Sequence, residues 1–211
     1  MKKLTVDQVT DMIIETCNAI IESKPYLTEV DSKIGDGDHG IGMSGGMEKA
    51  KAELISKRPF ADINAIFKTT GMTMLNSMGG ASGVIFGSMF LGGVKGLESL
   101  KELDGESLAK IMRGSANAIQ ARGKAQVGDK TMIDALVPAV EAMEVSDKED
   151  VVEVLKVAKD AAAQGVEASK KMIAKFGRAK SLMERAVGYQ DAGATSVSII
   201  FDAMYKYVKS I

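Results

Sequence analysis

The 211-residue chain is poor in cysteine and aromatic side chains: it has one cysteine, no tryptophan and 5% aromatic residues. Because Cys17 is the only cysteine, a disulfide framework and a thiolate metal site are both excluded. Cys17 falls in a helical pattern of apolar residues, and we expect it in the core. This use of cysteine fits a reducing compartment, so a cytoplasmic location is expected.

The chain also lacks an excess of charge of either sign. Its 27 Lys and Arg residues and 28 Asp and Glu residues give a net charge of −1. There is no long basic run and no interleaving of aromatic with basic residues, which argues against a nucleic-acid partner. Small molecules or proteins are the expected partners. A hydrophobic content of 45% suffices for one sizeable core, so residues 1–211 are expected to form one domain.

Uniformly apolar runs of membrane-spanning length are missing as well. Residues 69–94 carry no charge, and Gly79, Gly83 and Gly87 have a spacing found where transmembrane helices pack. However, the Gly79-Gly80 pair and several Thr, Ser and Asn side chains interrupt this segment. We therefore expect two buried helices joined by a tight turn, and no membrane partner.

Apolar residues recur at helical spacing, and no segment shows the alternation of a β-strand. Two capping boxes, Thr5-x-x-Gln8 and Ser146-x-x-Glu149, and a cap at Asp62 mark three helix starts. The spacing predicts an all-α fold, a closed barrel or bundle of about eight antiparallel helices. The predicted helices cover residues 5–24, 43–58, 62–78, 81–92, 108–119, 132–143, 146–177 and 194–207.

The segment 177–193 has little apolar periodicity and several charges, which indicates a long functional loop or lid. Arg178 and Arg185 within it are candidates to clamp a phosphate group or a base. Exposure to solvent is, however, the commoner fate of an arginine.

Three carboxylates within eight residues, separated by glycines, stand out in the chain: Asp31, Asp36 and Asp38. Two carboxylates about 4 Å apart repel by about 4 kcal/mol at an effective dielectric of about 20, so a converging trio needs a counter-charge. Magnesium is a natural one, because it prefers oxygen ligands and is usually shared between carboxylates and substrate phosphates. A metal and phosphate site is one interpretation, and a solvated acidic turn is the other, since Asp and Gly are common in turns.

Two further interpretations of this stretch fit its residues poorly. Gly35-x-Gly37-x-x-Gly40 matches the dinucleotide-binding pattern, but no apolar strand precedes it and the aspartates would repel a phosphate without metal. A calcium-binding loop beginning at Asp36 needs an oxygen ligand, glycine and glutamate where the chain has Gly40, Ile41 and Met47.

Helix starts rich in small residues offer backbone N–H groups and a partial positive charge to an anion. Three stretches have this composition: Gly79-Gly80-Ala81-Ser82-Gly83, Gly128-Asp129-Lys130-Thr131 and Gly193-Ala194-Thr195-Ser196. A plain cap or close helix packing explains any one of them, and a phosphate site is favoured only if they gather at the acidic stretch. His39, the only histidine, is either a hydrogen-bonded turn residue or a phosphate or nucleotide contact.

Four ordered motifs connect the chain to a known family. They are Asp31 with Gly35-Asp36-Gly37-Asp38-His39-Gly40, Gly80-Ala81-Ser82-Gly83, the stretch from Gly128 to Leu136, and Gly177-Arg178-Ala179 with Gly188-Tyr189-Gln190-Asp191-Ala192-Gly193-Ala194. In this order, over nearly the whole chain, they resemble the nucleotide-binding L subunit of dihydroxyacetone kinase. The resemblance implies an eight-helix barrel with a nucleotide at one end. The chain departs from the family pattern at Tyr189 and Ala192, where histidine and proline are frequent.

The resemblance also implies which residues bind the cofactors, two Mg²⁺ ions and ADP or ATP. The metal ions are expected on the carboxylates of Asp31, Asp36 and Asp38. The residues expected around the phosphate groups are His39, Gly40, Ile41, Gly42, Ala81 and Ser82. Those expected around ribose and adenine are Gly123, Met132, Arg178, Asp191, Ala192 and Gly193.

The resemblance further implies phosphoryl transfer in which this chain supplies the phosphate and magnesium. A separate L chain resembles the bacterial form, in which bound ADP acts as a coenzyme. There, a phosphohistidine-carrying M subunit of the phosphotransferase system rephosphorylates the ADP, and the resulting ATP phosphorylates dihydroxyacetone on a K subunit. An ATP-exchanging kinase part and a nucleotide-dependent regulatory module are the alternatives, and pairing of the chain with itself as a homodimer stays open.

Overall fold

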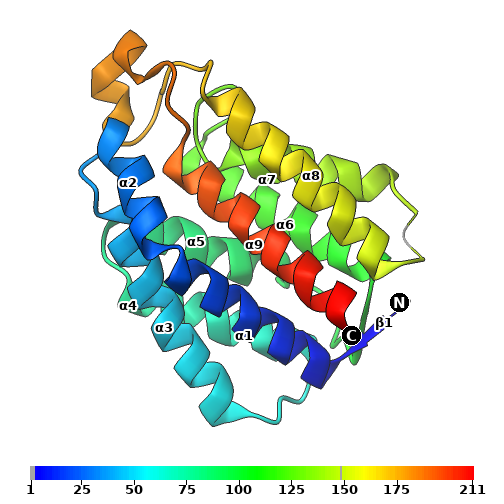
Figure 1. Ribbon diagram of the computed structural model, residues 1–211. Helices are drawn as coiled ribbons and strands as arrows, with labels where there is room; N and C mark the ends of the chain where they lie inside the picture. The colour runs from blue at the N-terminus through cyan, green and yellow to red at the C-terminus, as the bar shows by residue number, and fades with distance from the viewer. Residues whose placement is uncertain (1–2, 148) are drawn as a thin grey trace.

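The computed structural model describes residues 3–147 and 149–211, and helices make up most of them (Figure 1). The all-α class predicted from the sequence is therefore confirmed. The described residues form nine α-helices: α1 (Val6–Glu22), α2 (Lys24–Ile34), α3 (His39–Lys57), α4 (Ile63–Ser77), α5 (Gly80–Gly93), α6 (Gly105–Gly123), α7 (Ile133–Val145), α8 (Val151–Ser169) and α9 (Ala192–Ser210). They also form a 3-10 helix, η1 (Arg178–Ala186), and two short strands, β1 (Lys3–Thr5) and β2 (Glu102–Asp104).

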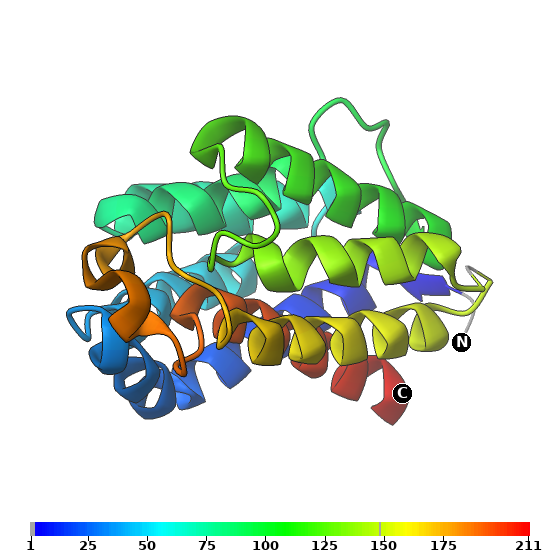
Figure 2. The ribbon, with the colours of Figure 1, turned by 90° about the horizontal axis from the view of Figure 1, so that it is seen from above.

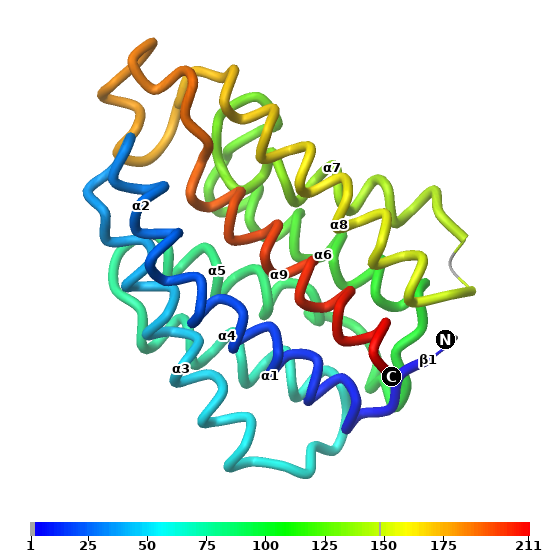
Figure 3. Tube along the Cα trace, in the orientation of Figure 1, coloured from blue at the N-terminus to red at the C-terminus, as the bar shows by residue number. Residues whose placement is uncertain are grey.

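The long helices pack in the order in which the chain reaches them, with α2 set aside. Contacts join α1 to α3, α3 to α4 and so on through α9, and α9 also packs against α1 (Figures 1 and 3). Their apolar stripes enclose the core, where the largest buried side chains include Phe67, Phe90 and Phe201. Figure 2 shows α2 and η1 together at one end of these helices and both chain termini at the other.

Two helices, α2 and η1, are not predicted by the apolar pattern. Pro25 lies in the first turn of α2, where its fixed φ and missing N–H suit a helix start, whereas the sequence suggested only a stop for the preceding helix. η1 lies inside the expected lid, and α8 ends at Ser169 instead of continuing to about residue 177. The helices therefore outnumber the expected eight, and Asp31 lies on α2 rather than in a loop.

The expectation that the chain has no strand is wrong at one place. β1 and β2 pair in antiparallel fashion with Leu4 opposite Leu103, and both leucines are fully buried. Each strand has three residues, too few for an alternating pattern to appear in the sequence. The strand pair lies near the chain termini, at the end of the helices opposite α2 and η1 (Figure 1).

Two of the three predicted helix caps are confirmed. Thr5 heads the capping box of α1, and the side chain of Asp62 caps α4. The box predicted at Ser146 is wrong, because the side chain of Asp150 caps α8. Ser146 instead donates its hydroxyl to the carbonyl of Met143 at the C-terminal end of α7.

The uncharged segment 69–94 forms parts of α4 and α5, which pack against each other. A Cβ on Gly71 would lie 2.8 Å from the carbonyl oxygen of Gly87, so glycine allows the two backbones to approach closely. Within the described residues, no helix combines the length and the apolar character needed to cross a membrane. Cys17 is buried, as expected.

Candidate functional site

The three aspartates of the acidic stretch converge in space. Asp31 lies in the last turn of α2, and Asp36 and Asp38 lie in the loop that leads into α3. One carboxylate oxygen from each residue lies within 4.8 Å of the other two. Burial, and then the negative charges of Asp36 and Asp31, raise the pKa of Asp38. The cluster therefore carries a repulsion that a divalent cation relieves, and its oxygen donors suit Mg²⁺.

Two glycines allow the loop to fold back over α2. The N–H of Gly35 donates to the carbonyl of Asp31 at 2.6 Å, and a Cβ on Gly35 would lie 2.3 Å from Oδ1 of Asp31. Any side chain at Gly35 would therefore push the Asp31 carboxylate away from the other two. Gly37 has a φ of +77°, in the left-handed region that other residues rarely adopt. The glycines of this stretch thus bring the carboxylates together.

An arginine of the expected lid reaches the acidic cluster. Arg178 begins η1, and its Nε lies 2.8 Å from Oδ2 of Asp36. The Arg178 side chain is 76% exposed, so the ion pair contributes little to stability. It does bring the beginning of the lid next to the aspartates. Arg185, the other candidate in the lid, is exposed and does not line the cavity found there.

A cavity of about 800 Å³ opens beside the aspartates. Its walls come from the loop between α2 and α3, the starts of α3, α5 and α9, and the beginning of the lid. The predicted site residues that line it are Asp31, Asp36, Asp38, His39, Ile41, Gly42, Ala81, Ser82, Arg178, Asp191, Ala192 and Gly193. Residues from distant parts of the sequence thus meet at one end of the helices.

Three predicted site residues do not line this cavity. Gly40 packs against α2, since a Cβ there would lie 2.3 Å from Oγ1 of Thr28. Met132 packs against Gly193: a Cβ added to Gly193 would lie 3.2 Å from the Cβ of Met132. Gly123 is the last residue of α6 and is half-buried. Whether these three residues contribute to ligand binding stays a prediction.

The starts of α3 and α5 face the cavity without a cap from the preceding residue, although Asp31 accepts a hydrogen bond from the N–H of His39 at 3.3 Å. Neither Asp38, before α3, nor Gly79, before α5, makes a capping hydrogen bond through a side chain. The first turn of α5, which contains Ala81 and Ser82, therefore presents backbone N–H groups and a partial positive charge to the cavity. This arrangement suits a phosphate group.

The expected opening at residues 128–131 is an internal turn and not a wall of the cavity. The carboxylate of Asp134 accepts hydrogen bonds from the N–H groups of Gly128, at 2.5 Å, and Thr131, at 2.7 Å. These N–H groups are thus already satisfied within the chain, which favours the alternative of a plain cap over a phosphate site at this helix start. The helix itself, α7, begins at Ile133.

His39 is a buried residue at the start of α3. Its Nε2 lies 2.8 Å from Oγ of Ser196 on α9, and its ring centroid lies 6.0 Å from that of Phe86. Burial lowers the pKa of His39, and the charge of Asp31 opposes this shift. His39 is therefore hydrogen-bonded, as one interpretation expected, and it also lines the cavity.

Asp191 caps α9 and faces the cavity. Its carboxylate accepts a hydrogen bond from the N–H of Ala194 at 2.7 Å. Burial raises the pKa of Asp191 to about 7; the charge of Asp134 adds to the shift, whereas Lys130 opposes it. The resemblance places Asp191 near the nucleotide, and the structure adds its role as a cap.

A buried polar cluster behind this wall is not predicted by the sequence. Lys130, Asp134 and Ser169 are each at most 1% exposed. The Nζ of Lys130 donates to the carbonyl of Ser169 at 2.7 Å and to that of Tyr189. In the sequence, residues 128–131 are a small-residue helix opening and part of one family motif. Nothing in the sequence separates this lysine from the exposed ones, because its burial depends on how distant segments pack.

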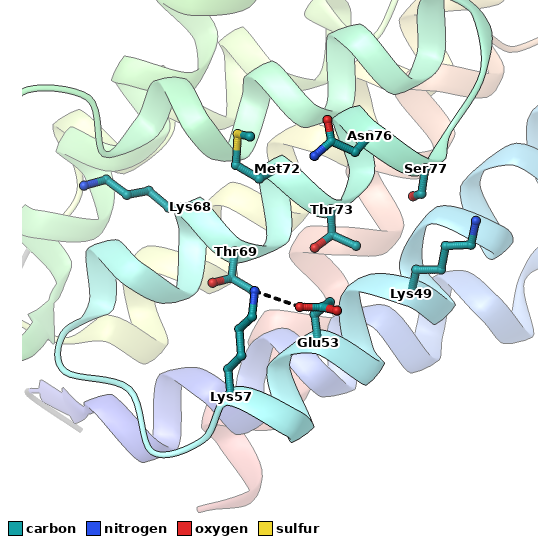
Figure 4. A pocket seen from close by; sticks show the side chains of 9 residues that line it. All are labelled: Lys49, Glu53, Lys57, Lys68, Thr69, Met72, Thr73, Asn76 and Ser77. Atoms are coloured by element: carbon teal, nitrogen blue, oxygen red, sulfur yellow. Dashed lines mark ion pairs between the residues drawn. The ribbon is translucent and has the colours of Figure 1, made fainter.

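A second hollow lies between α3 and α4 and contains none of the predicted site residues (Figure 4). It measures about 480 Å³, and its walls include Lys49, Lys57, Lys68 and one carboxylate, that of Glu53. Figure 4 shows Glu53 paired with Lys57, with 2.7 Å between Oε2 and Nζ. Because it lacks grouped carboxylates, this hollow is a poorer candidate for a metal site.

Comparison with known proteins identifies the class of this chain. The DAK2 domain matches residues 33–206, and the chain belongs to this family. It is 40% identical over 183 residues to the ADP-binding subunit of PEP-dependent dihydroxyacetone kinase 1 from Listeria innocua, covering 87% of each chain. It is 36% identical over 203 residues to the ADP-binding subunit of PEP-dependent dihydroxyacetone kinase from Escherichia coli, covering 95% of this chain and 96% of the relative.

A solved structure shares the fold. The dihydroxyacetone kinase of C. freundii in complex with AMP-PNP and Mg²⁺ matches with a TM-score of 0.73 and 24% sequence identity. The match covers 94% of this chain and 33% of the other, so this chain spans about a third of the length of that kinase. The likeness therefore shows the fold.

Proposed function

We propose that this chain is the ADP/ATP- and magnesium-carrying subunit of a dihydroxyacetone kinase. In this proposal residues 1–211 form one nucleotide-binding domain, in which α1 and α3 to α9 make a closed barrel of eight helices with the nucleotide at one end. The successive contacts of these helices, including that of α9 with α1, support the barrel. The names of the two bacterial relatives, both ADP-binding kinase subunits, support the activity.

The observation that carries the proposal is the meeting of two features in one cavity. Three carboxylates within 4.8 Å of one another and the uncapped start of α5 border the same space. The carboxylates suit Mg²⁺, and the helix start suits a phosphate group. A nucleoside diphosphate or triphosphate with magnesium supplies both groups at once. A solvated acidic turn, in contrast, has no use for a facing helix start.

Each part of the site then has a role in phosphoryl transfer. When bound, two Mg²⁺ ions neutralise charge on the nucleotide phosphates. The residues proposed to hold them are Asp31, Asp36 and Asp38. Groups of residues 39–42 and 81–82 bind and orient phosphate. The residues proposed to enclose ribose and adenine are Gly123, Met132, Arg178, Asp191, Ala192 and Gly193. The chain thus contributes positioning and charge stabilisation, which dominate catalysis of phosphoryl transfer.

The proposed acceptor and donor lie on other chains in the cytoplasm. Dihydroxyacetone held by a K subunit accepts the terminal phosphoryl group through a hydroxyl oxygen, which leaves ADP in place. A phosphohistidine-carrying M subunit of the phosphotransferase system then passes its phosphoryl group from nitrogen to the terminal phosphate oxygen of this ADP. The PEP-dependent kinases named among the relatives support this route. The proposal accommodates a homodimer as well as a single copy of the chain.

The first test is the nucleotide content of the purified chain. The chain is purified with Mg²⁺, passed through gel filtration and denatured, and the released nucleotide is identified and counted by chromatography. One ADP for each chain is the expected result for a retained coenzyme. An empty chain that binds and exchanges ATP would indicate an ATP-exchanging kinase part. Failure to bind nucleotide even with Mg²⁺ would overturn the site.

A second test separates a kinase subunit from a nucleotide-dependent regulatory module. Asp36→Asn keeps the shape of the side chain but removes a charge from the metal cluster. With K and M subunits added back, we expect dihydroxyacetone phosphorylation to fall at least about a hundredfold, as when transition-state charge stabilisation is lost. Gly45→Ala on α3 is the control, because a Cβ there meets nothing within 4 Å. Full activity of Asp36→Asn would favour the regulatory module.

A further inference from the structure

Lys130 is the one buried lysine or arginine among the residues that the structure describes, with 1% of its surface exposed. A buried ammonium group is costly unless hydrogen bonds or opposite charges compensate it. Its Nζ donates to the carbonyl oxygens of Ser169 and Tyr189, and the carboxylates of Asp191 and Asp134 act on it electrostatically. Its φ of +59° is unusual for a lysine, which indicates that the surroundings hold this residue in place.

The two carbonyl groups that Lys130 binds mark the two ends of the lid. Ser169 ends α8, and Tyr189 stands just before Asp191, the cap of α9. The N–H of Asp191 also donates to Oγ of Ser169 at 3.0 Å. Residues 170–188 therefore leave the helices and return to them at one point, as in a compact loop whose ends are close. We call this point, where Ser169 and Lys170 meet Gly188 and Tyr189, the lid neck. In the structure the lid comprises residues 170–188, so it begins earlier and ends earlier than the predicted segment 177–193.

A hydrogen bond between two backbone groups also closes the lid neck. The N–H of Gly188 donates to the carbonyl of Lys170 at 2.7 Å. Further along the lid, the Nζ of Lys175 lies 2.7 Å from Oδ1 of Asp129, the residue before Lys130. The Lys175 side chain is 66% exposed, so this contact is the weaker attachment. The buried ammonium of Lys130 is thus the side-chain group that joins both ends of the lid.

Residues before and after the closing end of the lid neck line the cavity. Phe176, Gly177 and Arg178 line the cavity at the beginning of the lid, and Arg178 pairs with Asp36. Asp191, directly after the lid neck, lines the cavity at the start of α9. A shift at the lid neck therefore moves both the cover and one wall of the cavity.

We propose that Lys130 is a positioning residue for the bound nucleotide: by joining the two ends of the lid, it holds the lid over the cavity and slows nucleotide release. This inference rests on the proposed nucleotide-carrying function and adds to it the group that sets the residence time. Lys130 acts through the lid and through Asp191 and needs no contact with the nucleotide. Slow release is what a subunit that retains ADP as a coenzyme requires.

The direct test is the rate at which ADP leaves the chain. Lys130→Met keeps much of the side-chain length and removes the ammonium group. Release of radiolabelled ADP from the Mg²⁺-loaded full chain into excess unlabelled ADP is expected to be at least about tenfold faster, because hydrogen bonds to charged groups are strong. Lys180→Met, which removes an exposed lysine of the same lid, is the matched control and should change the rate less than about twofold.

Two further measurements distinguish a positioning role from a general loss of structure. With K and M subunits added back, Lys130→Met should raise the concentration of added ADP that gives half-maximal dihydroxyacetone phosphorylation, and should leave kcat at saturating ADP within about twofold of wild type, because the metal and phosphate ligands are untouched. Amide hydrogen exchange should become faster in residues 170–188 and stay unchanged in α4. A general loss of structure would lower kcat and speed exchange in both segments.

The proposal stays testable if Lys130→Met does not fold. Ser169→Ala removes the hydrogen bond that Oγ accepts from the N–H of Asp191 at the lid neck, and should speed ADP release about threefold. ADP release at the wild-type rate from a folded Lys130→Met chain would overturn the role of Lys130. Where that chain cannot fold, release at the wild-type rate from Ser169→Ala would overturn the proposal that the lid neck slows nucleotide release. A wild-type chain that binds no ADP with Mg²⁺ would instead overturn the proposed function.

Discussion

The helices at the two ends of the molecule begin in different ways. At the end away from the aspartates, α1, α4, α6 and α8 each begin with a side chain that accepts a hydrogen bond from a first-turn N–H: Thr5, Asp62, Asp104 and Asp150. At the cavity, the residues before α3 and α5 make no such bond, and at α3 the carboxylate of Asp31 accepts a hydrogen bond from the N–H of His39 at 3.3 Å instead. A cap contributes about 1 kcal/mol, so the cavity end gives up stability that the other end keeps. The difference supports the proposal that the free N–H groups at the start of α5 bind phosphate.

Adding a cap to α5 should remove this difference between the two ends. Of the changes considered in this comparison, it should have the largest effect on ADP binding. Gly79→Asp places a carboxylate at the N-cap, where a φ of −81° and open space admit a side chain. The carboxylate would occupy N–H groups proposed for phosphate, and at about 4 Å would repel it by about 4 kcal/mol. We expect calorimetry with ADP and Mg²⁺ to show at least about a hundredfold weaker binding, since about 4 kcal/mol corresponds to nearly a thousandfold. The free chain should gain a few tenths of a kcal/mol in stability.

A neutral cap at the same position is the control. Gly79→Ser offers a hydroxyl to the same N–H groups without a negative charge. It should stabilise the free chain to a similar degree and weaken ADP binding less than about tenfold. If Gly79→Asp bound ADP as tightly as the wild-type chain, the start of α5 would not be a phosphate site.

Removing a cap at the opposite end should affect stability alone. Asp62 accepts hydrogen bonds from the N–H of Ala65, at 2.8 Å, and from the hydroxyl of Ser99, at 2.7 Å. Asp62→Ala loses both, so urea unfolding should show a loss of about 1–2 kcal/mol. ADP affinity should stay unchanged, because no ligand site depends on this helix start. Asp62→Asn, which keeps an oxygen acceptor, should lose less; weaker ADP binding in either variant would contradict the separation of the two ends.

Features that depend on neighbours in sequence could be predicted. The caps at Thr5 and Asp62 follow from a short polar side chain placed just before an apolar stripe. The metal cluster is also local, since Asp36 and Asp38 share one loop and Asp31 lies one helical turn before it. For Asp191 and Ala192 the family resemblance is the only signal, whereas Gly193 also belongs to a small-residue helix start; all three line the cavity.

Features that depend on distant packing could not be predicted. Gly40 belongs to the acidic motif, yet it lies against Thr28 because α2, an element that the apolar stripe does not reveal, packs on α3. In the sequence Lys130 cannot be distinguished from a solvent-exposed lysine. It is buried in the structure because the two ends of the lid pack around it. The strand residue Leu4 is buried through its pairing with β2, in a segment too short to show a period. In each case the partner is remote in sequence.

α9 is the exception at the cavity end, because Asp191 caps it as aspartates cap helices at the other end. Its setting differs, since burial raises the pKa of Asp191 to about 7. An aspartate in an unfolded chain has a pKa of about 3.9. Between about pH 4 and about pH 7 the folded chain keeps a proton that the unfolded chain has lost, so stability falls as the pH rises and levels off near pH 8.

Asp191→Asn removes this proton and keeps an oxygen that accepts the hydrogen bond from the N–H of Ala194. The free energy of unfolding of the wild-type chain, relative to the variant, should therefore fall by about 1 kcal/mol between about pH 6 and about pH 8. Urea titrations of both chains without nucleotide measure this difference, in which the contributions of all other titrating groups cancel. A difference independent of pH would mean that Asp191 stays ionised and caps α9 in the same way as Asp62 caps α4.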